Sequence, residues 1–197
     1  MLLQSLCYLS QPPRENLSSR CKSESVKSDS VEHKSNHQAE IRLRVVAPED
    51  EAFLYEVYRS VRSEELTAWG WDETQQEMFL KMQLKARDQS YLMYYPGLDN
   101  QIILFRNQPA GRLIVSRTDE DIRLVDIALL PEYRNARIGT GLIEDLFAEA
   151  DATNRPVRLQ VEKTNPPALR LYERLGFLVT SDNQTHFQME WKSRDEG

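Results

Sequence analysis

The chain has 197 residues, a formal net charge of −6 at pH 7 and two cysteines, Cys7 and Cys21. The acidic balance disfavours nucleic acid, and no apolar run approaches the roughly 20 residues needed to cross a bilayer, so we expect neither partner. Both cysteines lie near the N-terminus, and the histidines His33, His37 and His186 are scattered. We therefore expect no disulfide and no metal site in the folded part, and a cytoplasmic location.

Residues 1–39 differ in composition from the rest of the chain. They hold serine clusters, few large apolar residues after Leu17 and no periodic apolar face, which is typical of a disordered tail. The apolar opening MLLQSLCYL lacks a preceding basic segment and a small-residue cleavage site, so we do not expect a signal peptide. Residues 40–197 have the size of one domain.

One strand and two helices are predicted first. Alternation in IRLRVV, residues 41–46, predicts a strand, and Pro48 followed by three acidic residues predicts a helix start. A second helix is predicted to begin at Asp72, because Gln75 completes a capping box, and to run into the late eighties. The connection between the two helices is TAWGW, residues 67–71.

Three strands come next, at residues 101–105, 112–116 and 122–130, and the short turns between them predict an antiparallel meander. An apolar stripe that starts at Leu142 predicts a third helix, and an alternating strand follows at residues 156–162. Because a strand, a helix and a strand form a crossover unit, strands 122–130 and 156–162 are predicted to be parallel neighbours.

The chain ends with a short helix and two strands. Asn165 suits the helix cap, Pro166 the first turn and Gly176 a left-handed stop. The last strands are predicted near residues 177–180 and 186–191. The element order βααβββαβαββ predicts an α+β fold, with a mixed, mostly antiparallel sheet of about seven strands and helices on both faces.

The stretch RNARIGTG, residues 134–141, predicts a phosphate seat between a strand and a helix. A P-loop would need GxxxxGK[ST], and a dinucleotide fingerprint would need GxGxxG directly after a strand; neither pattern is present. What remains is a loop whose backbone N–H groups converge at the start of the third helix, where the helix dipole favours an anion. Gly139 permits close approach, and Arg134 and Arg137 add positive charge.

The same stretch resembles the acetyl-CoA-binding motif of the GNAT superfamily of N-acetyltransferases, written [R/Q]-x-x-G-x-[G/A]. Arg134 matches its first position and Gly139 its last. A second block, NPPALRLYERLGF at residues 165–177, resembles the closing signature of that family, in which an asparagine and a tyrosine face the cofactor. The two blocks occur in the family's order and spacing, so the resemblance covers residues 41–191.

The resemblance implies the GNAT-type acyl-CoA N-acyltransferase fold, with acetyl-CoA as co-substrate and no metal. Strand 122–130 would splay from strand 156–162, and the pantetheine arm would lie in the gap. The positions implied to hold the cofactor are Ile127, Leu129, Leu130, Arg134, Asn135, Ala136, Arg137, Ile138, Gly139, Thr140 and Asn165. The cap role of Asn165 would by itself explain that residue.

Arg137 departs from the family pattern, because a glycine usually stands at this position. If the position needs a positive φ, an arginine costs about 1 kcal/mol in backbone strain. We expect weakened or altered cofactor seating; the alternative is that the Arg137 side chain reaches a CoA phosphate.

The reaction requires two proton transfers. An alkylammonium, with a pKa of ~10, must lose a proton before it can attack, and a proton donor helps the CoA thiolate to leave. Tyr172 matches the family's general acid, and core packing is its alternative role. Gln160 stands where members resembling the ribosomal-protein alanine acetyltransferases carry a glutamate, and it cannot accept a proton. Asp126 is the candidate base; the alternatives are a structural carboxylate bonded to a backbone N–H or to Arg123, and a chain of waters.

Trp69 and Trp71 lie in the connection that forms the acceptor wall in this family, where aromatic rings could hold a cationic amine; capping of a core edge is the alternative. The sequence thus predicts an N-acetyltransferase that moves acetyl from acetyl-CoA directly to a primary amine of a small molecule or peptide, as a monomer or homodimer. A non-catalytic acyl-CoA-binding or regulatory module is the alternative that Arg137 and Gln160 keep open. Nucleotide-phosphate binding without acyl transfer is disfavoured by the missing motifs.

Overall fold

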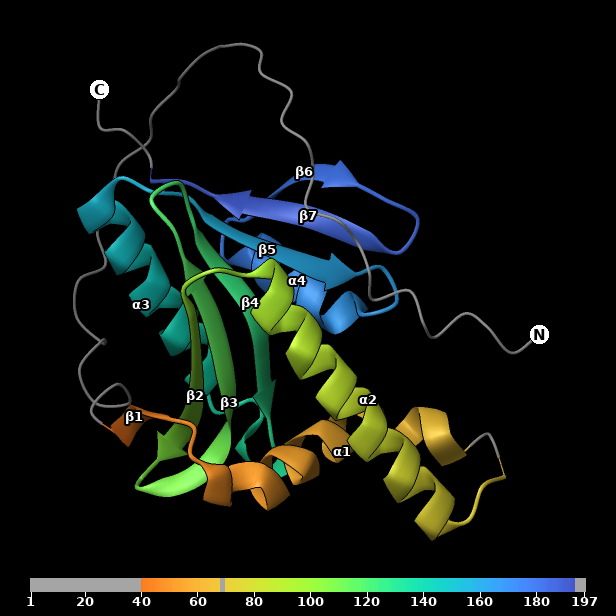
Figure 1. Ribbon diagram of the computed structural model, residues 1–197. Coiled ribbons are helices and arrows are strands. Elements are labelled where there is room, and N and C mark those ends of the chain that lie inside the picture. Colours follow the sequence, from red (N-terminus) through yellow and green to blue (C-terminus); the bar gives the residue numbers. More distant parts are fainter. Residues whose placement is uncertain (1–39, 68–69, 194–197) are drawn as a thin grey trace.

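The strands form a single mixed sheet of seven in the spatial order β1-β2-β3-β4-β5-β7-β6 (Figure 1). The computed structural model describes residues 40–67 and 70–193. The strands are β1 (Ile41–Val45), β2 (Leu98–Phe105), β3 (Gln108–Arg117), β4 (Ile122–Leu129), β5 (Val157–Glu162), β6 (Leu178–Asp182) and β7 (His186–Trp191). Neighbouring strands are antiparallel except β4 and β5, which are parallel. The predicted α+β fold is confirmed, whereas the predicted tail, residues 1–39, lies outside the described residues.

Helices and short 3-10 turns connect the strands. They are η2 (Pro48–Asp50), α1 (Glu51–Thr67), α2 (Glu73–Tyr94), η3 (Pro131–Tyr133), α3 (Ile138–Thr153) and α4 (Pro166–Arg174). The predicted caps are confirmed: the Asp72 carboxylate accepts from the Gln75 N–H, and the Gln75 side chain accepts from the Asp72 N–H. Asn165 caps α4 by accepting from the Ala168 N–H, and Gly176 follows α4 with a φ of 92°.

The β2–β3 hairpin is longer than predicted. Its turn lies at Arg106 and Asn107, whose φ values are 52° and 64°, rather than at the Pro-Ala-Gly that follows. The register between the two strands shifts so that Ala110 is an extra residue between Pro109 and Gly111. A bulge of this kind accommodates a proline and a glycine inside a strand, which is why the turn residues were misleading.

Helix α2 also runs past its predicted end. It continues to Tyr94 and stops where Tyr95 takes an extended conformation, because the residue before a proline, here Pro96, disfavours helix. None of the helices in the described ranges is long and apolar enough to span a membrane.

The helices cover opposite faces of the sheet, α3 and α4 on one side and α1 and α2 on the other (Figure 1). On the first side, Ile143 and Leu146 of α3 pack with Tyr172 of α4 and the inward side chains of the strands in a large apolar cluster. On the second side, a much smaller cluster joins Tyr58 of α1 to Leu80 and Leu84 of α2. The sheet therefore separates a thick apolar core from a thinner layer that contains more polar groups.

Candidate functional site

A bulge in β4 opens the sheet between β4 and β5. The register against β3 jumps between Leu124 and Asp126, so Val125 is an extra residue. Pairing of β4 with β5 is confined to residues 122–124 of β4, and beyond them the two strands diverge (Figure 1). The backbone of residues 126–129 therefore has an edge without a strand beside it. Such an edge offers hydrogen-bonding groups to an extended ligand.

The residues predicted at this edge already make contacts within the protein. The side chains of Ile127 and Leu129 pack against the apolar cluster of the α3 side. The Leu130 N–H donates to the Ala110 carbonyl at 3.0 Å, and the Leu129 carbonyl accepts from Arg134 Nε at 3.0 Å. The Leu130 N–H is thus already engaged with β3.

The loop after β4 delivers several backbone N–H groups to the start of α3. In this helix the Gly141 N–H donates to the Arg137 carbonyl at 2.9 Å. The N–H groups of Ile138, Gly139 and Thr140 precede that bond and therefore have no acceptor within the helix. Arg137, the N-cap residue, forms no side-chain cap hydrogen bond. Because these N–H groups and the helix dipole both favour negative charge, this end of α3 suits a phosphate group.

Two residues of the loop adopt left-handed backbone conformations. The φ values are 62° at Asn135 and 58° at Arg137. Asparagine tolerates this region, whereas an arginine there costs about 1 kcal/mol. Ala136, which lies between them, packs against the apolar cluster and helps to hold the turn. The positive φ considered for Arg137 from the sequence is therefore present, and its side chain is exposed.

The guanidinium of Arg134 fastens the loop to α1. It donates to the Leu129 carbonyl at 3.0 Å and to the carbonyl and hydroxyl of Ser60 at 3.2 and 3.3 Å. The Arg134 guanidinium, which the sequence predicted to bind phosphate, therefore already donates to these three acceptors within the protein. The structure thus gives Arg134 a role in holding the position of the loop.

Gly139 has room beside its backbone for a small group. An added Cβ would meet only Ile127 Cδ1 at 3.7 Å, an ordinary contact, and the φ of this residue is not positive. Neither packing nor backbone conformation within the protein therefore requires a glycine here. The space beside it is available to a ligand that approaches the backbone closely.

Tyr172 lies on α4 with 9% of its surface exposed, and its ring packs edge-on against Phe177 with centroids 5.7 Å apart. Burial, and secondarily the negative charge of Asp126, raise the pKa of the Tyr172 phenol to about 12. The phenol is therefore protonated near neutral pH and can donate a proton. Asn165, also predicted at the site, uses its side-chain oxygen to cap α4.

Asp126 faces α2, where Arg87 is its counter-charge. Arg87 Nη2 and Asp126 Oδ2 are 3.4 Å apart. The sequence-based alternative that paired Asp126 with Arg123 is wrong, because Arg123 Nη2 donates to Asp121 Oδ2 at 2.8 Å. Burial by itself lowers the pKa of the Arg87 guanidinium, but the Asp126 carboxylate and other neighbours raise it overall.

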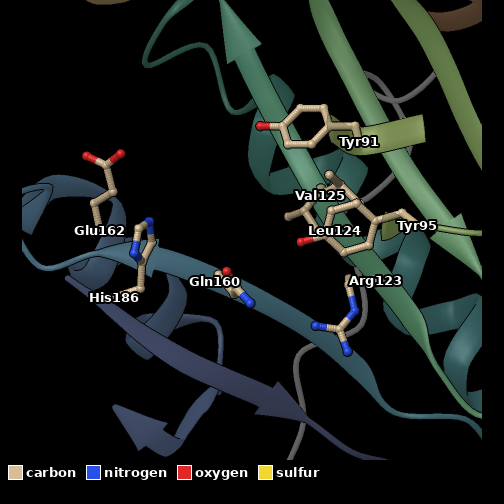
Figure 2. Close-up of a pocket in the computed structure, with 8 residues that line it drawn as sticks. All are labelled: Tyr91, Tyr95, Arg123, Leu124, Val125, Gln160, Glu162 and His186. Carbon is tan, nitrogen blue, oxygen red and sulfur yellow. The ribbon is translucent and has the colours of Figure 1, made fainter. Parts of the chain in front are cut away.

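A cavity of about 60 Å³ lies between α2 and the diverging strands (Figure 2). Its lining residues are Tyr91, Tyr95, Arg123, Leu124, Val125, Gln160, Glu162 and His186. Gln160 lies between Arg123 at one end and Glu162 with His186 at the other (Figure 2). The cavity therefore has an aromatic wall, a neutral amide in its middle and charged groups at both ends.

Sequence reasoning missed most of this cavity. His186, predicted to be isolated, lies beside Glu162, and its Nδ1 is 2.8 Å from Thr185 Oγ1. Arg87 and Tyr91 of α2 are spaced four apart, so they share one face of the helix, and Tyr95 follows directly after its end. That spacing was the available signal, but only the fold shows that this face meets β4.

The predicted acceptor tryptophans are not brought to the cavity. Trp71 packs its ring edge-on against Phe79 of α2, with centroids 5.1 Å apart, and does not line the cavity. Trp69 lies outside the described residues. Across the described ranges, no three or more histidine, cysteine, aspartate or glutamate side chains gather as a metal site would require.

Residues 54–177 match the model of the acetyltransferase (GNAT) family. Among solved structures, PaiA N-acetyltransferase of Thermoplasma acidophilum in complex with coenzyme A superposes with a TM-score of 0.58 and 21% identity, over 78% of this chain and 99% of that one. An acetyltransferase of Thermus thermophilus gives a TM-score of 0.57 and 19% identity, over 78% and 97%. Ard1 of Thermoplasma volcanium gives 0.52 and 17%, over 79% and 99%. No curated protein sequence matches the chain.

The left-handed conformation of Arg137 predicts a difference between two substitutions that remove the same side chain. Arg137→Gly relieves the steric cost of positive φ, whereas Arg137→Ala retains it, so we expect the glycine variant to be more stable by about 1 kcal/mol. Urea unfolding of both variants measures this difference. Equal stabilities would show that the loop leaves the left-handed region in solution.

Proposed function

Because the chain belongs to the GNAT family of acetyltransferases, we propose that it transfers an acetyl group from acetyl-CoA directly to a primary amine of a small molecule, peptide or protein. The observation that carries this proposal is the unpaired edge of β4: the cavity is lined by residues 123–125 at its start, and the loop to the N-terminus of α3 follows its end. In this proposal one reactant approaches from each side of the gap, and the buried phenol of Tyr172 belongs to the adjoining core.

The residues around the gap fit coenzyme A. The free N–H groups of Ile138, Gly139 and Thr140 would bind the pyrophosphate, and the bare backbone at Gly139 would let it approach. The exposed side chain of Arg137 adds a positive charge, while Asn135 and Ala136 shape the turn. The open edge of β4 would pair with the amides of the pantetheine arm. When bound, acetyl-CoA supplies the acyl group as an activated thioester.

The amine would enter from the α2 side, through the cavity lined by Tyr91, Tyr95 and Gln160. The aromatic rings provide surfaces against which a cationic or partly desolvated amine can pack. Gln160 is a hydrogen-bond partner but accepts no proton. Positioning of the amine against the thioester is the main contribution that such a cavity makes to the rate.

Asp126 and Tyr172 would transfer the protons. The amine nitrogen forms a bond to the acyl carbon, the carbon–sulfur bond breaks, and the sulfur leaves with the bonding electrons. Asp126, or a water bonded to it, takes the proton that the amine loses. Tyr172 gives its phenolic proton to the departing thiolate and regains one from solvent.

The proposal is tested with acetyl-CoA and a panel of small amines and peptide N-termini. We expect release of free thiol that depends on the amine, together with an acetylated product seen by mass spectrometry. Tight coenzyme A binding without turnover of any panel member would instead favour a non-catalytic acyl-CoA-binding module. Absence of coenzyme A binding would overturn both.

Gly139→Ala separates ligand contact from folding. The added methyl has room within the protein and improves helix propensity, so we expect stability to be unchanged or raised by up to about 1 kcal/mol. The same methyl would meet the bound pyrophosphate, so affinity for coenzyme A should fall about tenfold in calorimetry. Gly141→Ala is the matched control, because its Cβ also meets a single atom, Ile41 Cδ1 at 3.8 Å. Equal affinities of the two variants would contradict the proposed seat.

Tyr172→Phe keeps the ring and removes the proton donor. We expect kcat to fall about 100-fold, with KM for acetyl-CoA changed less than about twofold. With a phenol pKa of about 12, Tyr172 stays protonated while the amine titrates, so the loss should persist from about pH 6 to about pH 10. Tyr133→Phe, which removes a hydroxyl from a ring packed on Phe105, should retain activity. Unchanged turnover in Tyr172→Phe would restrict Tyr172 to core packing.

A further inference from the structure

We infer that Arg87 is a positioning residue for the proposed reaction: it holds Asp126 as a carboxylate anion at the bulge of β4 and thereby couples α2 to the proton chemistry. This inference rests on the proposed function. It does not follow from the motifs in the sequence, because Arg87 lies outside both of the family-like blocks.

Arg87 is enclosed by two tyrosine rings. Its guanidinium carbon lies 4.6 Å from the ring centroid of Tyr58 on α1 and 5.5 Å from that of Tyr91 on α2. Aromatic faces stabilise a cation without neutralising its charge. The cage therefore presents the guanidinium toward β4 with its charge intact, and Asp126 lies there at 3.4 Å.

Asp126 depends on this cation more than on hydrogen bonds. Its buried Oδ2 has no hydrogen-bond partner, and neither does the buried Nε of Arg87. A buried carboxylate oxygen without a hydrogen bond is costly to keep charged unless an opposite charge is close. The only cation paired with this carboxylate among the described residues is Arg87, 3.4 Å away, so the inference is that loss of this cation favours the neutral acid.

The surrounding charges leave Asp126 as the main partner of Arg87. Asp88, the other acid near Arg87, lies 3.8 Å from its Nε but accepts from Arg112 Nη1 at 2.8 Å, and Arg112 Nε donates to Asn100. The charged or titratable groups around the pair are Tyr58 of α1, Asp88 and Tyr91 of α2, Arg112 of β3 and Tyr172 of α4. The adjoining cavity adds Tyr95, Arg123 of β4, Glu162 of β5 and His186 of β7.

The negative charge of Asp126 has a second consequence, at Tyr172. After burial, which is the larger cause, that charge raises the pKa of the Tyr172 phenol further. Through its contact with Asp126, Arg87 thus acts on both residues proposed to transfer protons, Asp126 and Tyr172. It touches neither reactant, because its guanidinium is enclosed between the rings and the strand.

Arg87→Met tests the inference, with Arg112→Met as a matched control. Both remove a largely buried arginine that contacts Asp88, but only Arg87 contacts Asp126. We expect both variants to unfold at lower temperature. Only Arg87→Met should lose activity preferentially at low pH, so that kcat/KM falls about tenfold further at about pH 6 than at about pH 9. Arg87→Lys, which keeps the charge, should restore most of the profile.

Two further measurements keep the test decisive. Asp126→Asn should abolish the additional pH dependence caused by Arg87→Met, because the two residues act as a unit. Carbon-13 NMR of the Asp126 carboxyl, which needs no turnover, should show protonation at higher pH in Arg87→Met than in the unsubstituted protein. If Arg87→Met does not fold, Arg87→Gln takes its place.

The outcomes separate the inference from the function on which it rests. Identical pH profiles for Arg87→Met and Arg112→Met, or an unchanged NMR titration of Asp126, would overturn the positioning role while acetyl transfer stands. A shifted NMR titration in a protein that acetylates no amine would support the charge coupling and refute the proposed reaction.

Discussion

β4 pairs with β5 over three residues, and beyond that point its edge faces a gap. The cause is local: one extra residue, Val125, changes the register against β3 and bends the strand. An unpaired edge inside a sheet leaves backbone donors and acceptors without partners, which is a substantial cost unless water or a ligand satisfies them. The proposed cofactor site is therefore the place where the sheet is incomplete, and an extended ligand with its own amides would complete it.

The N-terminus of α3 depends on the same divergence. Ile138, fully buried, anchors the first turn of the helix in the apolar core, while Arg134 ties the preceding loop to α1. Between these two anchors, Arg137 is held in a left-handed conformation that an arginine does not favour. The loop thus presents its N–H groups without needing a ligand to order them. Such preorganisation lowers the entropic cost of binding an anion.

Local signals in the sequence predicted the fold well, because caps and turns act over a few residues. Capping hydrogen bonds join residues three apart, so they can be predicted from the sequence; Asp72 forms one with Gln75, and Asn165 forms one with Ala168. The β2–β3 turn was misplaced because a bulge absorbed Pro109 and Gly111. The parallel pairing of β4 with β5 was also predicted, because the crossover rule applies to any strand–helix–strand unit. Side-chain contacts between distant segments could not be predicted: the contact between Arg87 and Asp126 joins residues of α2 and β4, and no local pattern specifies it.

The two faces of the sheet differ in a way that bears on specificity. The α3 and α4 face is packed almost entirely with apolar side chains, so a substitution that changes the volume of one side chain there would disturb the packing of the core. The α1 and α2 face has a small apolar cluster and a network of buried ions around Arg87 and Arg112. Buried ion pairs contribute little net stability, but they fix which groups face each other. For the proposed reaction we therefore expect acceptor specificity to depend on residues of the second face and cofactor seating on residues of the first. Asp126, paired with Arg87 on the second face, is linked to the first by its charge effect on Tyr172.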